Sequence, residues 1–246
     1  MALTDKLTAI ADAIRTKTGK TGELTLDQMV TEITGIQGGG GGYSIEDIAK
    51  TDGIKGDLVI DFRIPRSYAF YGLTGIGKVR FKKGFAGNYA TAINNLFANS
   101  SATEVYFDSE GVPEMRLNPS MFSNCKSLKK AILKDTAVSA SVFSGCSALE
   151  LFDYGGYTLS QDNALQNCSN LKTIVLRGST VVSVNAPTYW AFALNGTPFD
   201  NNPAGSGGTV YVPEALIEDY KIATNWSALY EAGTCNFVAI EGSEYE

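Results

Sequence analysis

Residues 121–133 read MFSNCKSLKKAIL, and the spacing of their side chains recurs further along the chain. Residues 142–154 read VFSGCSALELFDY, and residues 164–176 read ALQNCSNLKTIVL. In all three segments the second residue is apolar, a cysteine follows three residues later, a leucine at six, and apolar or aromatic residues at nine and eleven. Recurrence of one pattern at a near-constant period indicates a solenoid, in which each unit buries its apolar side against its neighbours.

Two further copies precede these three. One starts at Phe70 and a weaker one at Leu96, so the five starts, which include those at 122, 143 and 165, are separated by 26, 26, 21 and 22 residues. A spacing of two at the end of each copy is the side-chain period of a strand with one buried face. A spacing of three earlier in the copy suits a tight, 3₁₀-like turn. We therefore predict one short strand and one compact turn per unit, which is the plan of a leucine-rich repeat.

The turns also resemble one particular kind of repeat. The segments that contain Phe70, Phe122, Phe143 and Cys168 are similar to the BspA-like leucine-rich repeat, which reads aromatic residue, any residue, Asn or Gly, Cys, two further residues and Leu. The resemblance covers residues 58–212 and implies a leucine-rich-repeat solenoid of short parallel strands. We assign residues 44–208 to this solenoid.

A C-terminal cap is predicted for residues 209–246. Residues 209–213 are predicted to form the last strand and residues 214–224 a helix. The short motifs VYVP and NW resemble the closing segment of BspA-like proteins. We expect the acidic tail at 241–246 to face water and three apolar side chains to cover the last coil, namely Leu216, Tyr220 and Trp226.

The N-terminal residues 1–36 are predicted to form a helical hairpin. Residues 3–15 carry a helical apolar stripe, and Thr25 and Gln28 suit a capping box ahead of a second helix. Two short amphipathic helices rarely bury both stripes, although an isolated hairpin is the alternative. We therefore expect attachment or oligomerisation through Leu3, Leu7, Ile10, Ile14, Met29 and Ile33. The glycine run within residues 37–43 reads as a flexible linker, so the whole chain is expected to be an α+β protein.

Two sequence segments of this hairpin also resemble a known group of proteins. LTAIADAIRTKTG at residues 7–19 and LDQMVTEI at residues 26–33 resemble the N-terminal segment of tail and fibre proteins of phages that infect Firmicutes. The resemblance implies attachment to a virion, or trimerisation.

Composition excludes several classes of function. The 20 basic and 26 acidic residues give a net charge of −6, and the basic residues are scattered, which argues against nucleic-acid binding. No apolar run approaches the roughly 18 residues of a membrane span. The first residues lack an apolar signal-peptide core, so we expect synthesis in a host cytoplasm. Histidine, the commonest general base and zinc ligand, is absent.

Two sets of residues could carry chemistry. Cys125, Cys146 and Cys168 would form a column on stacked coils; without His or close Cys pairs, we predict buried free thiols there and at Cys235, with no metal and no cofactor. Carboxylate pairs could cleave sugars, and the candidates are Asp108, Glu110, Glu114 and Asp153. We interpret these as solvated carboxylates and predict no catalytic residue and no enzyme.

Aromatic residues are the candidates for ligand binding. Tyr189, Trp190 and Phe192 form a group that could bind a partner, but we favour the reading that Trp190 and Phe192 are the core of a degenerate sixth coil. Tyr157 is expected to be partly exposed along the solenoid.

These observations predict a phage virion structural protein of the tail tip, baseplate or fibre. The N-terminal helices would bind other virion proteins and form a homotrimer, and the solenoid would bind a host cell-surface glycan or protein. The alternatives are a capsid-attached head fibre or decoration protein, a bacterial BspA-like surface adhesin, and a sugar-cleaving enzyme.

Overall fold

The chain divides into two compact units, Met1–Ile54 and Lys55–Glu246. The computed structural model describes residues 3–19, 56–60, 67–81, 94–107, 115–133, 136–159, 161–187, 192–201 and 205–246. The second helix of the predicted hairpin, the glycine linker and the helix expected at residues 44–50 lie outside these ranges. The boundaries at residues 36 and 43 also lie outside these ranges, and the three predicted boundaries at residues 36, 43 and 208 stay predictions.

The described part of the first unit is helix α1 (Leu3–Thr18). The side chains of Ala11 and Ile14 are buried, and Ile10 packs against them. Leu7 is half-buried. The part of the predicted apolar stripe from Leu7 to Ile14 is thus the more buried face of α1, whereas the side chain of Leu3, together with Met29 and Ile33, lies outside the described part of the chain.

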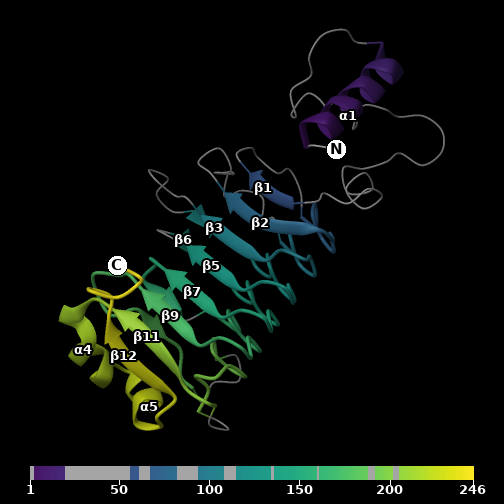
Figure 1. Ribbon diagram of the computed structural model, residues 1–246. Coiled ribbons are helices and arrows are strands. Elements are labelled where there is room, and N and C mark those ends of the chain that lie inside the picture. Colours follow the sequence, from purple (N-terminus) through teal and green to yellow (C-terminus); the bar gives the residue numbers. More distant parts are fainter. Residues whose placement is uncertain are drawn as a thin grey trace. The chain divides into compact units, whose positions relative to one another are not determined.

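The second unit is built on one parallel sheet of eight strands in the described part of the chain. Every strand pairs in parallel with its neighbours (Figure 1). The order across the sheet is β1 (Gly56–Ile60), β2 (Ile76–Phe81), β3 (Glu104–Phe107), β5 (Lys130–Leu133), β7 (Leu151–Tyr154), β9 (Thr173–Leu176), β11 (Gly208–Val212) and β12 (Cys235–Ala239). This arrangement confirms the predicted solenoid of short parallel strands.

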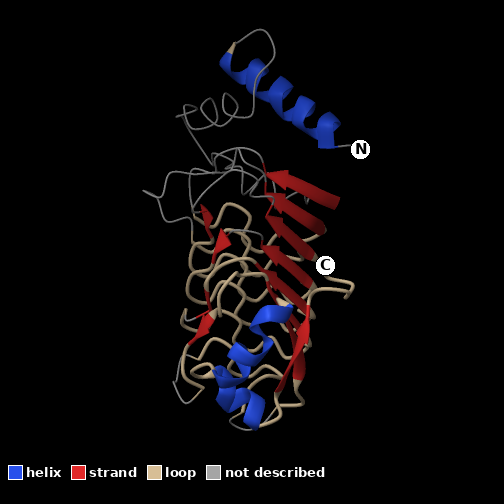
Figure 2. Cartoon of the chain, turned by 90° about the vertical axis from the view of Figure 1, so that its left-hand side faces the viewer, coloured by secondary structure: helices blue, strands red, loops and turns tan. Residues whose placement is uncertain are grey.

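Short strand pairs lie on the other side of the coils. β4 (Met115–Arg116) pairs with β6 (Thr136–Ala137), and β8 (Thr158–Leu159) pairs with β10 (Ser183–Val184). Figure 2 shows these pairs opposite the large sheet, so the coils that contain β4, β6, β8 and β10 have a strand on both sides and a turn between them.

The core lies between the large sheet and the turns. A spine of stacked rings crosses from coil to coil, with centroid distances of 4.8 Å for Phe70–Phe97, 5.3 Å for Phe97–Phe122 and 5.6 Å for Phe122–Phe143. Leu165 continues the spine and is fully buried. Burial of each such side chain stabilises the fold by about 1.5–3 kcal/mol.

In each turn the residue two positions after the spine residue lies in the left-handed backbone region. Only Asn and Gly occupy this position, with φ between 56° and 76°, at Gly72, Asn99, Asn124, Gly145, Asn167 and Gly196. These are the residues that accept a positive φ at least cost. A Cβ at Gly145 would overlap the Asn124 side chain, so the amide of one coil occupies the space above the glycine of the next.

The spine corrects the repeat register of the second coil. Phe97, and not Leu96, takes the spine position, because its ring stacks on Phe70 and Phe122. Phe97 lies eight residues before Val105, whereas Phe122 lies nine before the paired Ala131. The spacing pattern hid this shorter link, because Leu96 and Phe97 are both apolar.

The C-terminal residues close the solenoid with two short helices and a strand. A 3₁₀ turn (Glu214–Leu216) leads into α4 (Ile217–Ile222), and α5 (Trp226–Glu231) precedes β12. Tyr220 and Trp226 are fully buried, as predicted for a cap. The Trp226 indole N–H donates to the Val182 carbonyl at 2.6 Å, and the Val182 N–H donates to the Tyr220 hydroxyl at 2.8 Å. Among the described helices, none is long and apolar enough to cross a membrane.

Candidate binding surface on the sheet

The outward face of the large sheet carries aligned rows of side chains. Because strand residues alternate between faces and the strands are in register, equivalent outward residues lie beside one another. We call one line of paired residues the central row; it consists of Val59, Arg80, Tyr106, Ile132, Asp153, Val175, Tyr211 and Val238. A second line, the charged row, consists of Lys78, Glu104 and Lys130.

Charges of opposite sign alternate along the charged row. The Lys78 ammonium lies 3.2 Å from the Glu104 carboxylate, and the Lys78 main-chain N–H donates to the Asp57 carboxylate at 2.8 Å. The Tyr106 hydroxyl donates to the Glu104 carboxylate. The hydrogen bond from Tyr106 is the main cause that lowers the pKa of Glu104 below its usual value, and the Lys78 ammonium lowers this pKa further. Glu104 therefore stays ionised at neutral pH.

Tyr106 joins the two rows. Burial, together with the Glu104 carboxylate, raises the pKa of Tyr106 to about 12, so its hydroxyl remains protonated and keeps donating. The Arg80 guanidinium lies over the Tyr106 ring, 4.7 Å from its centroid, which is a cation–π geometry. The arrangement presents a cation and an aromatic ring whose positions are set by neighbouring strands.

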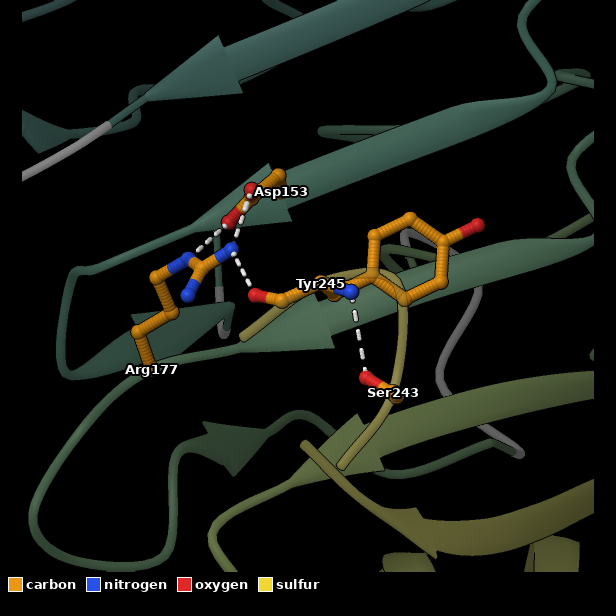
Figure 3. Close-up of polar contacts among 4 residues, drawn as sticks. All are labelled: Asp153, Arg177, Ser243 and Tyr245. Carbon is orange, nitrogen blue, oxygen red and sulfur yellow. Dashed lines mark hydrogen bonds and ion pairs between the residues drawn. The ribbon is translucent and has the colours of Figure 1, made fainter. Parts of the chain in front are cut away.

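The other end of the face carries a buried ion pair. Arg177, the first residue after β9, donates from Nε and one Nη to the two carboxylate oxygens of Asp153, at 2.7 and 2.9 Å (Figure 3). The Asp153 carboxylate raises the pKa of Arg177. Only 7% of the Asp153 side chain is exposed, compared with 28% for Arg177. The expectation of a solvated Asp153 is therefore wrong, because this residue lies on a strand and not in a loop.

The tail at residues 241–246 covers this end of the face. Arg177 also donates to the main-chain carbonyl of Tyr245 at 2.7 Å, and the Tyr245 ring lies edge-on to Tyr211 with centroids 4.6 Å apart. Figure 3 shows Tyr245 held by Arg177 on one side and by Ser243, whose hydroxyl accepts from the Tyr245 N–H at 3.1 Å, on the other. The expectation that the whole tail faces water is wrong for Tyr245, which is half-buried.

The cysteines form the predicted column and are buried free thiols. Each thiol donates to a main-chain carbonyl of the preceding coil, at 3.0 Å for Cys125, 3.1 Å for Cys146 and 3.2 Å for Cys168. Burial raises the pKa of the Cys168 and Cys235 thiols to about 12, and that of Cys146 well above its ordinary value. Within the described ranges, no three His, Cys, Asp or Glu side chains converge on a point where a metal ion would bind.

The aromatic residues singled out from the sequence lie in different environments. Phe192 is 1% exposed and Leu194 is fully buried in a turn that continues the coils, which agrees with the interpretation as a sixth coil. The Phe192 ring is thus not at the surface. Tyr157 is 70% exposed, so its role in binding stays a prediction. Tyr189 and Trp190 lie outside the described residues.

The central row was not predicted from the sequence. Its signal was present, because the outward residue of each strand lies one position after the first apolar strand residue of each copy, as Arg80 follows Val79 and Tyr106 follows Val105. The contact between Arg177 and Tyr245 had no such signal, since no repeat links these two residues.

Residues 63–172 match the family model described as the BspA type leucine rich repeat region, in six copies. A BspA-type leucine-rich-repeat region therefore occupies this part of the chain, within the wider range of 58–212 that the resemblance suggested. Comparison with curated proteins and with solved structures finds no match. Repeats of this type indicate a binding role.

Proposed function

We propose that this chain is a non-enzymatic structural protein of a phage virion, in the tail tip, baseplate or a fibre, and that it binds the host cell surface through its repeats. The observation that carries the binding role is the row of outward side chains on β1, β2, β3 and β5. Val59 in this row is 49% exposed, Arg80 lies beside it on the next strand, and Tyr106 lies beside Arg80 on the strand after that. The resemblance of residues 7–33 to phage tail and fibre proteins supports the virion assignment.

The chemistry of this face suits a polymer or protein at the host surface. Alternating charges in the charged row fix the orientation of a partner, while the aromatic ring and aliphatic side chains of the central row provide contact area. Individual contacts of this kind are weak. A homotrimer held by the N-terminal helices would multiply them, because linked sites bind with high effective concentration.

Binding is tested with fluorescently labelled full-length chain on a panel of intact Gram-positive bacteria. We expect saturable binding to at least one strain. Arg80→Ser should weaken it at least tenfold, because this change removes both the cation and its contact with Tyr106. Lys172→Ser, which removes an exposed cation outside the strands, is the matched control and should bind like the unchanged chain. Equal binding by both variants would contradict a role for the sheet face.

Assembly is tested by light scattering of the full-length chain and of a variant that lacks residues 1–36. A trimer that becomes a monomer on deletion supports oligomerisation through the N-terminal helices. A variant that remains trimeric places the interface on the repeats instead. Release of reducing sugar ends from host wall polysaccharide would contradict the non-enzymatic assignment.

A further inference from the structure

The turn of the first coil carries two exposed tyrosines. Tyr68 is 51% exposed and Tyr71 is 39% exposed, and their ring centroids lie 5.6 Å apart with the planes tilted by 55°. The two residues are three apart, and in a tight turn with about three residues per turn such side chains lie on the same side. They form an aromatic surface on the turn edge of the solenoid, away from the strand residues of the central row.

Tyr68 has a backbone conformation that is unfavourable for its residue type. Its φ is +62°, in the left-handed region. The equivalent residues of the next four coils have φ between 55° and 57° and are small and polar, namely Asn95, Ser120, Ser141 and Asn163. Asn in particular accepts this conformation at low cost, whereas a bulky aromatic residue there is a real outlier.

Packing does not account for the aromatic ring at this position. About half of the Tyr68 surface remains in solvent, so the ring contributes little to the core. The repeats also show that the turn forms with Asn or Ser. A strained, exposed aromatic residue beside a second exposed aromatic residue is a combination expected where a side chain contacts a ligand.

An open pocket lined by polar residues lies on the turns of the first three coils. It has a volume of about 380 Å³. Its described lining includes four hydroxyls, two amides and one amine, from Thr74, Ser100, Ser101, Ser127, Asn99, Asn124 and Lys126.

Two features connect the pocket with the rings. The Gly72 N–H donates to the Ala98 carbonyl at 2.9 Å, which holds the residue after Tyr71 next to the residue before Asn99. Thr74, at the edge of the pocket, lies three residues after Tyr71 on the same turn. The two tyrosines and the pocket residue Thr74 therefore belong to the same turn, and the turn of the next coil, which contributes Asn99, is bonded directly to it.

We propose that this turn edge is a carbohydrate-binding site. Tyrosine rings offer flat apolar faces with a polar tip, which suit the C–H face and the hydroxyls of a sugar ring. The amides and hydroxyls of the pocket both donate and accept hydrogen bonds, as sugar hydroxyls require. Lys126 is the charged group among the described lining residues, and none of these carries a carboxylate, so the site favours neutral or anionic glycans.

The test uses the full-length chain on an array of immobilised neutral, N-acetylated and phosphate-bearing oligosaccharides, followed by titration calorimetry with the best-bound compound. Tyr68→Asn and Tyr71→Ser introduce residues that other coils carry at these positions. Each is expected to weaken binding at least tenfold. Tyr68→Asn should leave the melting temperature unchanged or raise it, because Asn accepts the positive φ. Tyr230→Ser removes a tyrosine of the cap helix α5 that is exposed to a similar extent as Tyr71, at 38%, and is expected to bind normally.

Three results would overturn the proposal. The first is that the unchanged chain binds no oligosaccharide on the array. The second is that Tyr68→Asn binds as tightly as the unchanged chain. The third is that Tyr68→Asn lowers the melting temperature by several degrees, which would show that the ring serves packing. Arg80→Ser is expected to keep full array binding, so failure of the sheet-face proposal and failure of this one give different results.

Discussion

Replacement of Arg177 by methionine is the most informative single perturbation of the sheet face. Methionine keeps much of the aliphatic length of arginine but removes the guanidinium, which makes two hydrogen bonds to Asp153 and a third to the Tyr245 carbonyl. The Asp153 carboxylate then remains on the strand with 7% of its side chain exposed and without its cation.

The magnitude follows from the burial of the two partners. Loss of one partner of a fully buried pair costs about 3–5 kcal/mol, and loss of an exposed pair costs at most about 1 kcal/mol. Arg177 is 28% exposed, so the pair is nearer the buried limit but partly screened. We expect Arg177→Met to lower the free energy of unfolding by about 2–3 kcal/mol. For a unit of this size the melting temperature should fall by about 5–10 °C.

Two measurements check this expectation. Urea unfolding followed by circular dichroism gives the free energy, and hydrogen exchange should show faster exchange at residues 243–246 once the Arg177 contact to Tyr245 is lost. The double variant Arg177→Met with Asp153→Leu also removes the unpaired carboxylate, so its free energy of unfolding should lie within about 1 kcal/mol of that of the unchanged chain.

Either of two results would refute the role of the Asp153–Arg177 ion pair in stability. One is that Arg177→Met lowers the free energy of unfolding by less than about 0.5 kcal/mol, which is the range of an exposed ion pair. The other is a double variant less stable than Arg177→Met alone, since that would place the cost in lost packing and not in an unpaired carboxylate.

Three further predictions concern the turns, the thiols and the cap. Gly145→Ala should cost about 1–2 kcal/mol in urea unfolding through its positive φ, and more than Gly72→Ala, where a Cβ would meet nothing within 4 Å. The four buried thiols should react with Ellman's reagent only after unfolding; prompt reaction of the native chain would contradict their burial. Burial raises the pKa of Tyr220 to about 12, above the unfolded value of about 10. The stability that this neutral hydroxyl confers should therefore be complete below pH 10 and fall between about pH 10 and 12. Urea unfolding midpoints measured across this pH range should show the fall in the unchanged chain and not in Tyr220→Phe.

Local patterns determined the repeats of this chain. The period of two in the strands and of three in the turns arises from backbone geometry within a few residues, so the strands β2, β5, β7 and β9 could be placed from the spacing of apolar residues. The role of Asn124 and Gly145 in the turns was also local, because a positive φ is a property of one residue.

The predictions from sequence were wrong or incomplete at positions whose structure depends on contacts with a neighbouring coil. Leu96 and Phe97 are equally apolar, and only the stacking of Phe97 between Phe70 and Phe122 selects one of them. β12 was not predicted as a strand, because a parallel edge strand depends on the neighbouring β11 to bond its main chain.

Tertiary structure alone decided the character of the candidate surfaces. Asp153 and Arg177 are 24 residues apart, and Arg177 and Tyr245 are 68 residues apart. Whether a carboxylate is solvated or buried beside a cation depends on such distant partners, and no local pattern encodes them. The polar pocket likewise depends on how the coils stack, because its lining residues come from three of them. The sequence determined which residues repeat, and the stacking of the coils decided which of them face water and which face a neighbour.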